Sequence, residues 1–179
     1  TFFKILWGEA KPDSGEYTWG VTVTMGYLPN ENEKFFTEKQ NLVDWLRQYS
    51  AEKDETFIRG FLGRMLFSGE ETLKLCNVLS GGEKVRCMLS KMMMENPNVG
   101  LFDEPTNHLD LESIQALNNG MMEFSGVVLF HSHDQEVMNS IANRIIEITP
   151  NGMIDKYMKY EEFADDTQIK ERKKELYLS

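Results

Sequence analysis

Two adjacent carboxylates, Asp103 and Glu104, are the side chains of this sequence best placed to do chemistry. An apolar run at 99–102 precedes them and Pro105 follows them. This pattern predicts a β-strand over 98–104 that delivers both acids to its end. In an open α/β sheet, ligands bind beyond the carboxyl ends of the strands, and carboxylates placed there suit metal binding and the activation of water. A strand that ends in a solvated acidic turn would have the same pattern, so the neighbouring segments must decide between the two.

A glycine-containing turn before this strand is a second chemical signal. Ser80 and Glu83 have the spacing of a capping box, in which a serine hydroxyl starts a helix. Capping alone would explain these two residues, but Gly81 and Gly82 weaken a first helical turn by about 1 kcal/mol each relative to alanine. They also leave bare backbone N–H groups at the positive end of a helix, and such a surface binds phosphate.

His131 ends the next apolar run, at 126–131, and His133 follows two residues later. His133 stands between this predicted strand and a helix, where an imidazole can bond a phosphate oxygen and position a water molecule. The simpler alternative is a polar loop residue, with Ser132 or Asp134 as the N-cap of the helix. We assign His131 no role beyond the end of its strand.

The elements that must position these residues alternate between strands and helices in the second half of the chain. The run at 126–131 has the composition of a buried parallel strand, and we expect a helix at 134–142, a strand at 144–148 and an edge hairpin through 153–157. Helical patterns over 38–97, with Asn41 as one N-cap, a short helix at 72–77 and a helix at 83–94, indicate an insertion. Strands are expected at 16–20 and 21–28, after a helix that ends at Gly8. The fold class is therefore α/β.

The composition limits the function classes. The length of 179 residues fits one domain, or one domain with a subdomain. A formal net charge of −10 argues against binding nucleic acid through the bulk of the surface. No apolar run approaches the roughly 20 residues of a membrane span, and no signal-peptide pattern is present. Cys76 and Cys87 have no zinc-site spacing, which favours reduced thiols and a cytoplasmic location.

In this order and at these spacings, the motifs resemble the nucleotide-binding domain of the ATP-binding-cassette (ABC) superfamily. Residues 79–83 are similar to the ABC signature motif and residues 99–104 to the Walker B motif with its catalytic glutamate. Residues 107–110, which include His108, are similar to the D-loop, and His133 to the switch histidine. The segments 80–86, 103–113 and 132–136 resemble the ABC-F subfamily in particular.

The resemblance covers nearly the whole chain and implies a P-loop NTPase-like fold. We expect a mostly parallel sheet with antiparallel β elements and an inserted α-helical subdomain. The α/β core would comprise 1–37 and 98–160, the helical subdomain with the signature motif 38–97, and a charged C-terminal helix or tail 161–179.

The resemblance also implies ATP and Mg²⁺ as cofactors and ATP hydrolysis as the reaction. Asp103 corresponds to the aspartate that holds Mg²⁺, and Glu104 to the glutamate that polarises the attacking water. His133 corresponds to the histidine that senses the γ-phosphate. The residues matched to nucleotide-binding or site-linking positions across a domain interface are Ser80, Gly81, Gly82, Glu83 and Asp110.

ABC-F proteins carry two such domains in one chain, lack membrane domains and act on the ribosome. We therefore expect the second, C-terminal domain of such a protein. Its partners would be the other ABC domain of the same chain, in a head-to-tail ATP sandwich, and the ribosome through regions outside these residues. The alternatives are the ATPase subunit of an ABC transporter and a non-catalytic dimerisation or binding module.

Two departures from the family pattern affect the site. Residues 1–179 contain no G-x-x-x-x-G-K-[ST], the loop that cradles the phosphates. We expect a chain truncated just after this motif, with the first strand and P-loop missing, a gap in the sheet and weak or no activity of its own. The second departure is Asn30, which occupies the best-aligned Q-loop position and is one methylene shorter than the family's glutamine.

Overall fold

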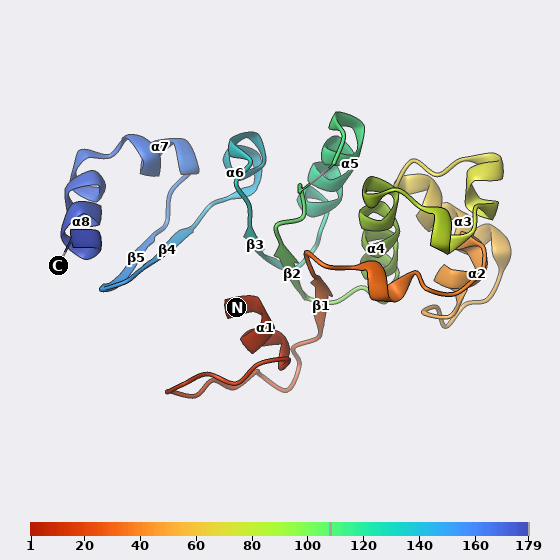
Figure 1. Cartoon of the computed structure of the whole chain (residues 1–179), viewed down its shortest axis with the longest axis horizontal. Helices are drawn as coiled ribbons and strands as arrows, with labels where there is room; N and C mark the ends of the chain where they lie inside the picture. Colours follow the sequence, from red (N-terminus) through yellow and green to blue (C-terminus); the bar gives the residue numbers. More distant parts are fainter. Residues whose placement is uncertain (108, 179) are drawn as a thin grey trace. The chain divides into compact units, whose positions relative to one another are not determined.

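The computed structural model describes residues 1–107 and 109–178, so His108 of the predicted D-loop lies outside the described residues. The chain divides into two compact units, residues 1–131 and residues 132–179 (Figure 1). The predicted division at 37, 97 and 160 stays a prediction. The elements of the first unit, in chain order, are α1 (Phe2–Trp7), β1 (Met25–Leu28), η1 (Glu33–Phe35), α2 (Leu42–Arg47), α3 (Glu55–Arg64), η2 (Gly69–Leu73), η3 (Cys76–Val78), α4 (Gly81–Glu95), β2 (Val99–Asp103), α5 (Leu111–Met122) and β3 (Val127–His131).

A parallel sheet in the order β1-β2-β3 forms the centre of the first unit. The central strand β2 is buried from Val99 to Phe102, and Asp103 at its end is half-buried. One face of the sheet packs against α1 through a cluster that contains Phe3, Tyr27 and Leu101. The predicted α/β class with a parallel sheet is confirmed. Because parallel strands end at the same edge, this sheet brings the ends of β1, β2 and β3 together.

The strand β3 is parallel as predicted, but it is an edge strand within the described residues, which corrects the prediction of a buried strand. Val127 is 58% exposed, and the next three residues of β3 are only half-buried. The reason is that β3 pairs with β2 alone, while β4 belongs to a separate two-stranded sheet. An apolar run therefore does not guarantee two covered faces and two paired edges.

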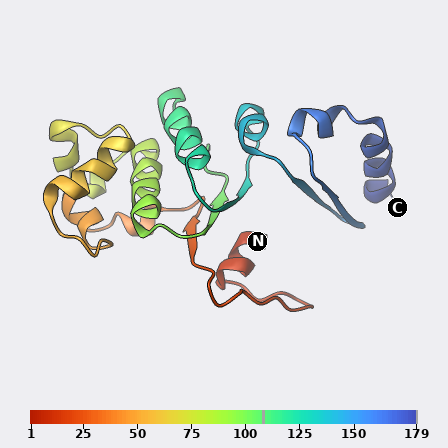
Figure 2. The ribbon, with the colours of Figure 1, turned by 180° about the vertical axis from the view of Figure 1, so that it is seen from behind.

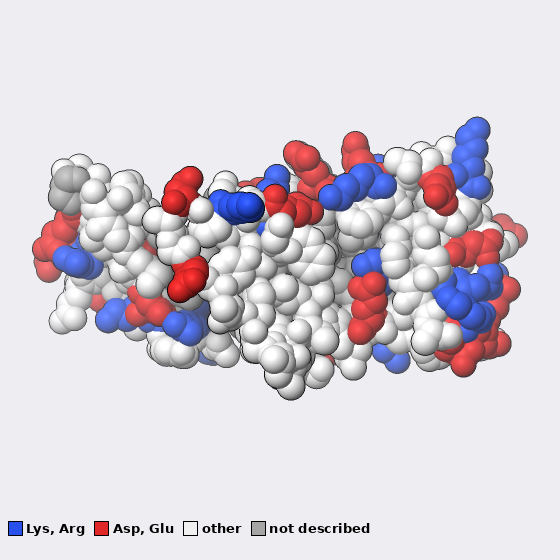
Figure 3. Space-filling model, turned by 90° about the horizontal axis from the view of Figure 1, so that it is seen from below, with Lys and Arg blue, Asp and Glu red and all other residues white. Residues whose placement is uncertain are grey.

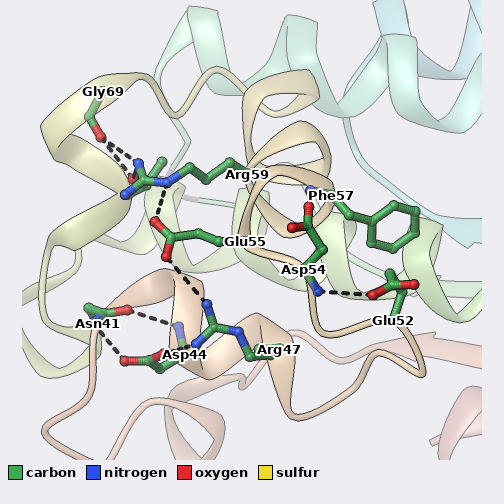
Figure 4. A network of polar contacts seen from close by, with 10 residues as sticks. Asn41, Asp44, Arg47, Glu52, Asp54, Glu55, Phe57, Arg59 and Gly69 are labelled. Carbon is green, nitrogen blue, oxygen red and sulfur yellow. Dashed lines mark hydrogen bonds and ion pairs between the residues drawn. The ribbon is translucent and has the colours of Figure 1, made fainter.

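The helical segment of the first unit is held by a buried core and a polar network. Its core includes Leu42, Trp45, Leu46, Ile58, Leu62 and Met88, all at or near zero exposure. The carboxylate of Glu55 joins Arg47, at 3.6 Å, to Arg59, at 2.8 Å, which links α2 to α3 (Figure 4). Arg59 also reaches the Gly69 carbonyl, at 3.3 Å, and thereby η2. Asn41 caps α2 as predicted, because its side chain accepts from the Asp44 N–H at 2.8 Å.

Three short predicted elements differ from the structure. Residues 16–20 form no strand, because their aromatic side chains turn back onto the end of α1: the Tyr17 hydroxyl donates to the Ile5 carbonyl, and Trp19 Nε1 donates to the Leu6 carbonyl at 3.2 Å. Only 25–28 of the predicted strand at 21–28 is extended and paired. The predicted helix at 72–77 consists of the two 3₁₀ turns η2 and η3.

The second unit contains α6 (Gln135–Ile141), β4 (Ile145–Thr149), β5 (Gly152–Lys156), α7 (Tyr160–Asp165) and α8 (Thr167–Leu178). The strands β4 and β5 form the predicted antiparallel hairpin. The guanidinium of Arg144 donates two hydrogen bonds to the Asp155 carboxylate, of 2.8 and 2.5 Å. The charged C-terminal segment folds onto the hairpin through a small core made of Ile154, Phe163, Ile169 and Leu176.

Gly126 is required by a close backbone approach at the start of β3. A Cβ atom there would lie 2.2 Å from the Asn98 carbonyl oxygen, the group that accepts from the Val127 N–H. We expect Gly126→Ala to lower the free energy of unfolding by about 1–3 kcal/mol, because the new methyl group would force the backbone of Asn98 and Gly126 apart. Gly60→Ala is the control. Gly60 lies inside α3 with open space around it, so alanine there should add up to about 1 kcal/mol. Urea unfolding measures both, and an unchanged Gly126→Ala midpoint would contradict the packing argument.

Candidate functional site

The candidate site lies where β2 and β3 end. Asp103 and His131 are direct neighbours in the parallel register of these strands. His131 Nδ1 lies 3.6 Å from Asp103 Oδ1 and 3.4 Å from Glu104 Oε1. The Asp103 and Glu104 side chains are 20% and 27% exposed, so both acids are partly accessible to solvent. The structure therefore places the two predicted acids and one histidine in a single cluster.

The backbone of Glu104 adopts a left-handed conformation, with φ of 48°. This region is uncommon for a residue other than glycine, and such residues concentrate at functional sites. The conformation is held from both sides: the Glu104 N–H donates to the His131 carbonyl at 2.9 Å, and the Glu104 carbonyl accepts from the Asn107 N–H at 3.2 Å. The Asn107 side chain also donates to the Glu104 carboxylate. The turn after β2 thus fixes the direction of this carboxylate.

Sequence reasoning missed the contacts of His131 and Asn107. We expected no role for His131 beyond its strand end, yet the structure places it against both acids. The pairing of Asp103 with His131 depends on strand order and register, which the residue pattern does not contain. The available signal was that both residues close apolar runs whose carboxyl ends meet at one sheet edge.

His133 lies in the second unit, in the loop between β3 and α6. The capping alternative for its neighbours is confirmed: Asp134 accepts from the Val137 N–H at 3.0 Å, and Ser132 Oγ accepts from the Asp134 N–H at 3.1 Å. These bonds fix the start of α6 next to His133. A role for His133 toward phosphate stays a prediction.

The predicted capping box at the start of α4 is present. Ser80 Oγ accepts from the Glu83 N–H at 3.2 Å, and Glu83 Oε2 accepts from the Ser80 N–H at 2.8 Å. Lys74 adds an ion pair to Glu83 at 2.6 Å. Burial acts to raise the pKa of Glu83, but the hydrogen bonds from Lys74 and from the Ser80 N–H lower it overall. Glu83 is therefore committed to holding the helix start, and any contact of Glu83 with nucleotide stays a prediction.

The two glycines of this motif have different surroundings. Gly81 has open space where a Cβ atom would lie, so its backbone is accessible to a ligand. A Cβ atom on Gly82 would lie 2.8 Å from Ser113 Oγ, because α4 and α5 pack side by side there (Figure 2). Only Gly81 thus retains the free approach that the sequence suggested for both.

Asp110 and Asn30 both lie in the first unit. Asp110 is the N-cap of α5, and its carboxylate accepts from the Ser113 N–H at 2.8 Å. Hydrogen bonds from Ser113 lower the pKa of Asp110. Asn30 is exposed two residues beyond β1, at the sheet edge to which β2 also delivers its acids. Their roles in linking sites and in the Q-loop stay predictions.

The donor set of the cluster fits a hard divalent cation. Mg²⁺ prefers carboxylate oxygens and keeps several water ligands, which Asp103 and Glu104 at an open strand end can accommodate.

Lysine and arginine form no broad basic patch on the face shown in Figure 3, where acidic and basic side chains are interspersed. None of the helices in the described part of the chain is long and apolar enough to span a membrane.

The sequence profile described as "ABC transporter" matches residues 1–107. The chain is 59% identical over 179 residues to "Uncharacterized ABC transporter ATP-binding protein YkpA" of Bacillus subtilis (strain 168), covering 99% of this chain and 33% of that protein. It is 34% identical over 177 residues to "Energy-dependent translational throttle protein EttA" of Haemophilus influenzae, covering 93% of this chain and 31% of EttA. The chain thus spans about a third of the length of these curated relatives.

A solved structure titled "RNase-L Inhibitor" superimposes with a TM-score of 0.72 over 98% of this chain and 40% of that one, at 20% sequence identity. At this identity the likeness concerns the fold alone.

The different surroundings of Gly81 and Gly82 predict different responses to alanine. We expect Gly82→Ala to lower the melting temperature, because its new methyl group must displace Ser113 and separate α4 from α5. Gly81→Ala should leave the melting temperature unchanged or raise it slightly. Combining Gly82→Ala with Ser113→Ala removes the clashing hydroxyl and should recover most of the loss. Equal melting temperatures for the two single variants would contradict this assignment.

Proposed function

This chain belongs to the ABC transporter family, and we propose that it is the ATP-binding and ATP-hydrolysing domain of a soluble, cytoplasmic ABC-F protein. Its curated relatives are ATP-binding proteins of the ABC-F type. The observation that carries the proposal is the placement of Asp103 at the carboxyl end of the central parallel strand and of Glu104 just after it, with His131 and Asn107 close to them. We propose that this segment is the C-terminal ABC domain.

The residues of the strand ends divide the chemistry between them. ATP supplies the phosphoryl group, and Mg²⁺ supplies charge that stabilises its transfer. Asp103 would hold the ion. Glu104 orients the attacking water, with its carboxylate aimed by the Asn107 side chain and its backbone held by the His131 carbonyl. Phosphoryl transfer requires mainly positioning and charge stabilisation, and a rigid pair of acids provides both.

The start of α4 contacts a second nucleotide, which is bound by the other ABC domain of the intact protein. Ser80 and the open backbone of Gly81 stand at the N-terminus of a 15-residue helix, whose dipole favours a phosphate. Gly82 and Glu83 keep this helix start in place. We propose that Asp110 links the two sites across the interface and that Asn30 serves as the Q-loop residue. His133 is proposed, from its motif alone, to sense the γ-phosphate.

A role on the ribosome is supported by the relative named as a translational throttle protein. Because these residues carry a net charge of −10, we propose that the ribosome contacts are made by regions outside them. Sedimentation of the intact protein with ribosomes, rather than with membranes, tests this role. Association with membranes instead would favour the transporter subunit, and loss of nucleotide binding by the intact protein would favour a non-catalytic module.

Residues 1–179 alone should bind MgATP poorly and hydrolyse it negligibly. They contain no phosphate-cradling loop, and β3 has no pairing partner on its second side within the described residues. Isothermal titration calorimetry of the 179-residue chain, with the intact protein as the positive control, measures this. Micromolar MgATP binding by the 179 residues would contradict the expectation.

Glu104→Gln should lower kcat for ATP hydrolysis by about 100-fold or more, because positioned general-base groups contribute factors of this size. ATP binding should persist, so the intact protein should accumulate in its closed, ATP-bound form. Glu171→Gln, an exposed position in α8, makes the same chemical change away from the site and should leave turnover unaltered. Steady-state phosphate release and nucleotide retention report the two effects. Unchanged turnover in Glu104→Gln would remove this residue from the role.

A further inference from the structure

A buried phenol next to the acidic cluster has no assigned function. Tyr27 is only 7% exposed, and its hydroxyl has no hydrogen-bond partner among the described residues. Buried hydroxyls are nearly always hydrogen-bonded, because leaving one unpaired costs about 1–3 kcal/mol. The Tyr27 hydroxyl therefore requires a hydrogen-bond acceptor, or a water held by one, close to its place on β1.

The strand register directs the Tyr27 side chain toward Asp103. Tyr27 on β1 is opposite Leu101 on β2, and Leu101 and Asp103, two residues apart, lie on the same face of β2. The register thus places Tyr27 on the same face of the sheet as Asp103, one strand away from it. His131 lies on the opposite flank of Asp103, on β3.

The ring of Tyr27 is fixed in direction by its packing. The Trp7 ring of α1 lies 5.5 Å from it, centroid to centroid, and Phe3 and Leu101 belong to the same buried cluster. A ring enclosed in this way cannot swing its hydroxyl out to solvent. The donor is therefore held in place near a carboxylate at little further cost in conformational entropy.

We propose that Tyr27 is a positioning residue for the divalent cation: its hydroxyl donates to the Asp103 carboxylate, or to a water that the carboxylate holds, and orients the remaining oxygen toward the ion. The inference rests on the proposed function, in which Asp103 holds Mg²⁺. Carboxylates that bind metals are themselves hydrogen-bonded, and loss of such an outer partner typically weakens metal binding 10- to 100-fold.

The test uses the intact protein with Tyr27→Phe, which removes only the hydroxyl. Mn²⁺ binding in the presence of a non-hydrolysable ATP analogue is followed by electron paramagnetic resonance, and it should weaken about 10-fold. The Mg²⁺ concentration for half-maximal ATP hydrolysis should rise by a similar factor, while kcat at saturating Mg²⁺ and the KM for ATP stay within about 2-fold of wild type. The melting temperature should change little, because the substitution keeps the ring and its packing against Trp7.

Tyr49→Phe is the matched control. Tyr49 packs against Trp45 in the helical segment, 5.2 Å between ring centroids, and burial raises the pKa of its phenol. This control should leave cation binding unchanged. The proposal is overturned if Mn²⁺ affinity is unaltered in Tyr27→Phe, whether or not the melting temperature falls. It is also overturned if Tyr27→Phe weakens binding of the ATP analogue in the absence of the cation. Wild-type protein that binds Mn²⁺ with the analogue but hydrolyses no ATP would refute the proposed function and leave the cation test intact.

Discussion

Parallel pairing on both sides of β2 is the constraint on which the arrangement of the site depends. The pairing with β3 sets Asp103 beside His131. The pairing with β1 sets Tyr27 opposite Leu101, which lies two residues before Asp103 on the same face of β2. A shift of one residue in either register would turn these side chains to opposite faces of the sheet and separate the cluster. The buried residues of β2 and the cluster against α1 make such a shift costly, because they would lose their apolar surroundings. The geometry of the acids is thus a by-product of core packing.

Local chemistry explains which parts of the structure were predictable. Asn41, Ser80 and Asp134 start helices because a side-chain oxygen can satisfy a free N–H at each helix start, and this depends on a few adjacent residues. The hairpin of β4 and β5 is equally local. The strand at 16–20 was predicted wrongly because Tyr17 and Trp19 find hydrogen-bond acceptors at the end of α1, far from them in sequence. Aromatic residues favour strands only when a sheet is available to receive them.

The candidate site divides along the same line. The types of Asp103 and Glu104 and the start of α4 were readable from short motifs. The contacts of Tyr27, His131 and Asn107 were not, because they depend on register, on burial and on the turn after β2. The different surroundings of Gly81 and Gly82 also required the structure, since only the packing of α5 distinguishes two adjacent glycines.

The left-handed backbone of Glu104 has a consequence for how this domain tolerates substitution. Glycine adopts such a conformation without steric cost, whereas other side chains are strained there by roughly 1 kcal/mol or more. Selection for thermal stability alone would therefore favour glycine at position 104, while selection for turnover would retain the carboxylate. Selection for stability and selection for activity therefore favour different residues at this position.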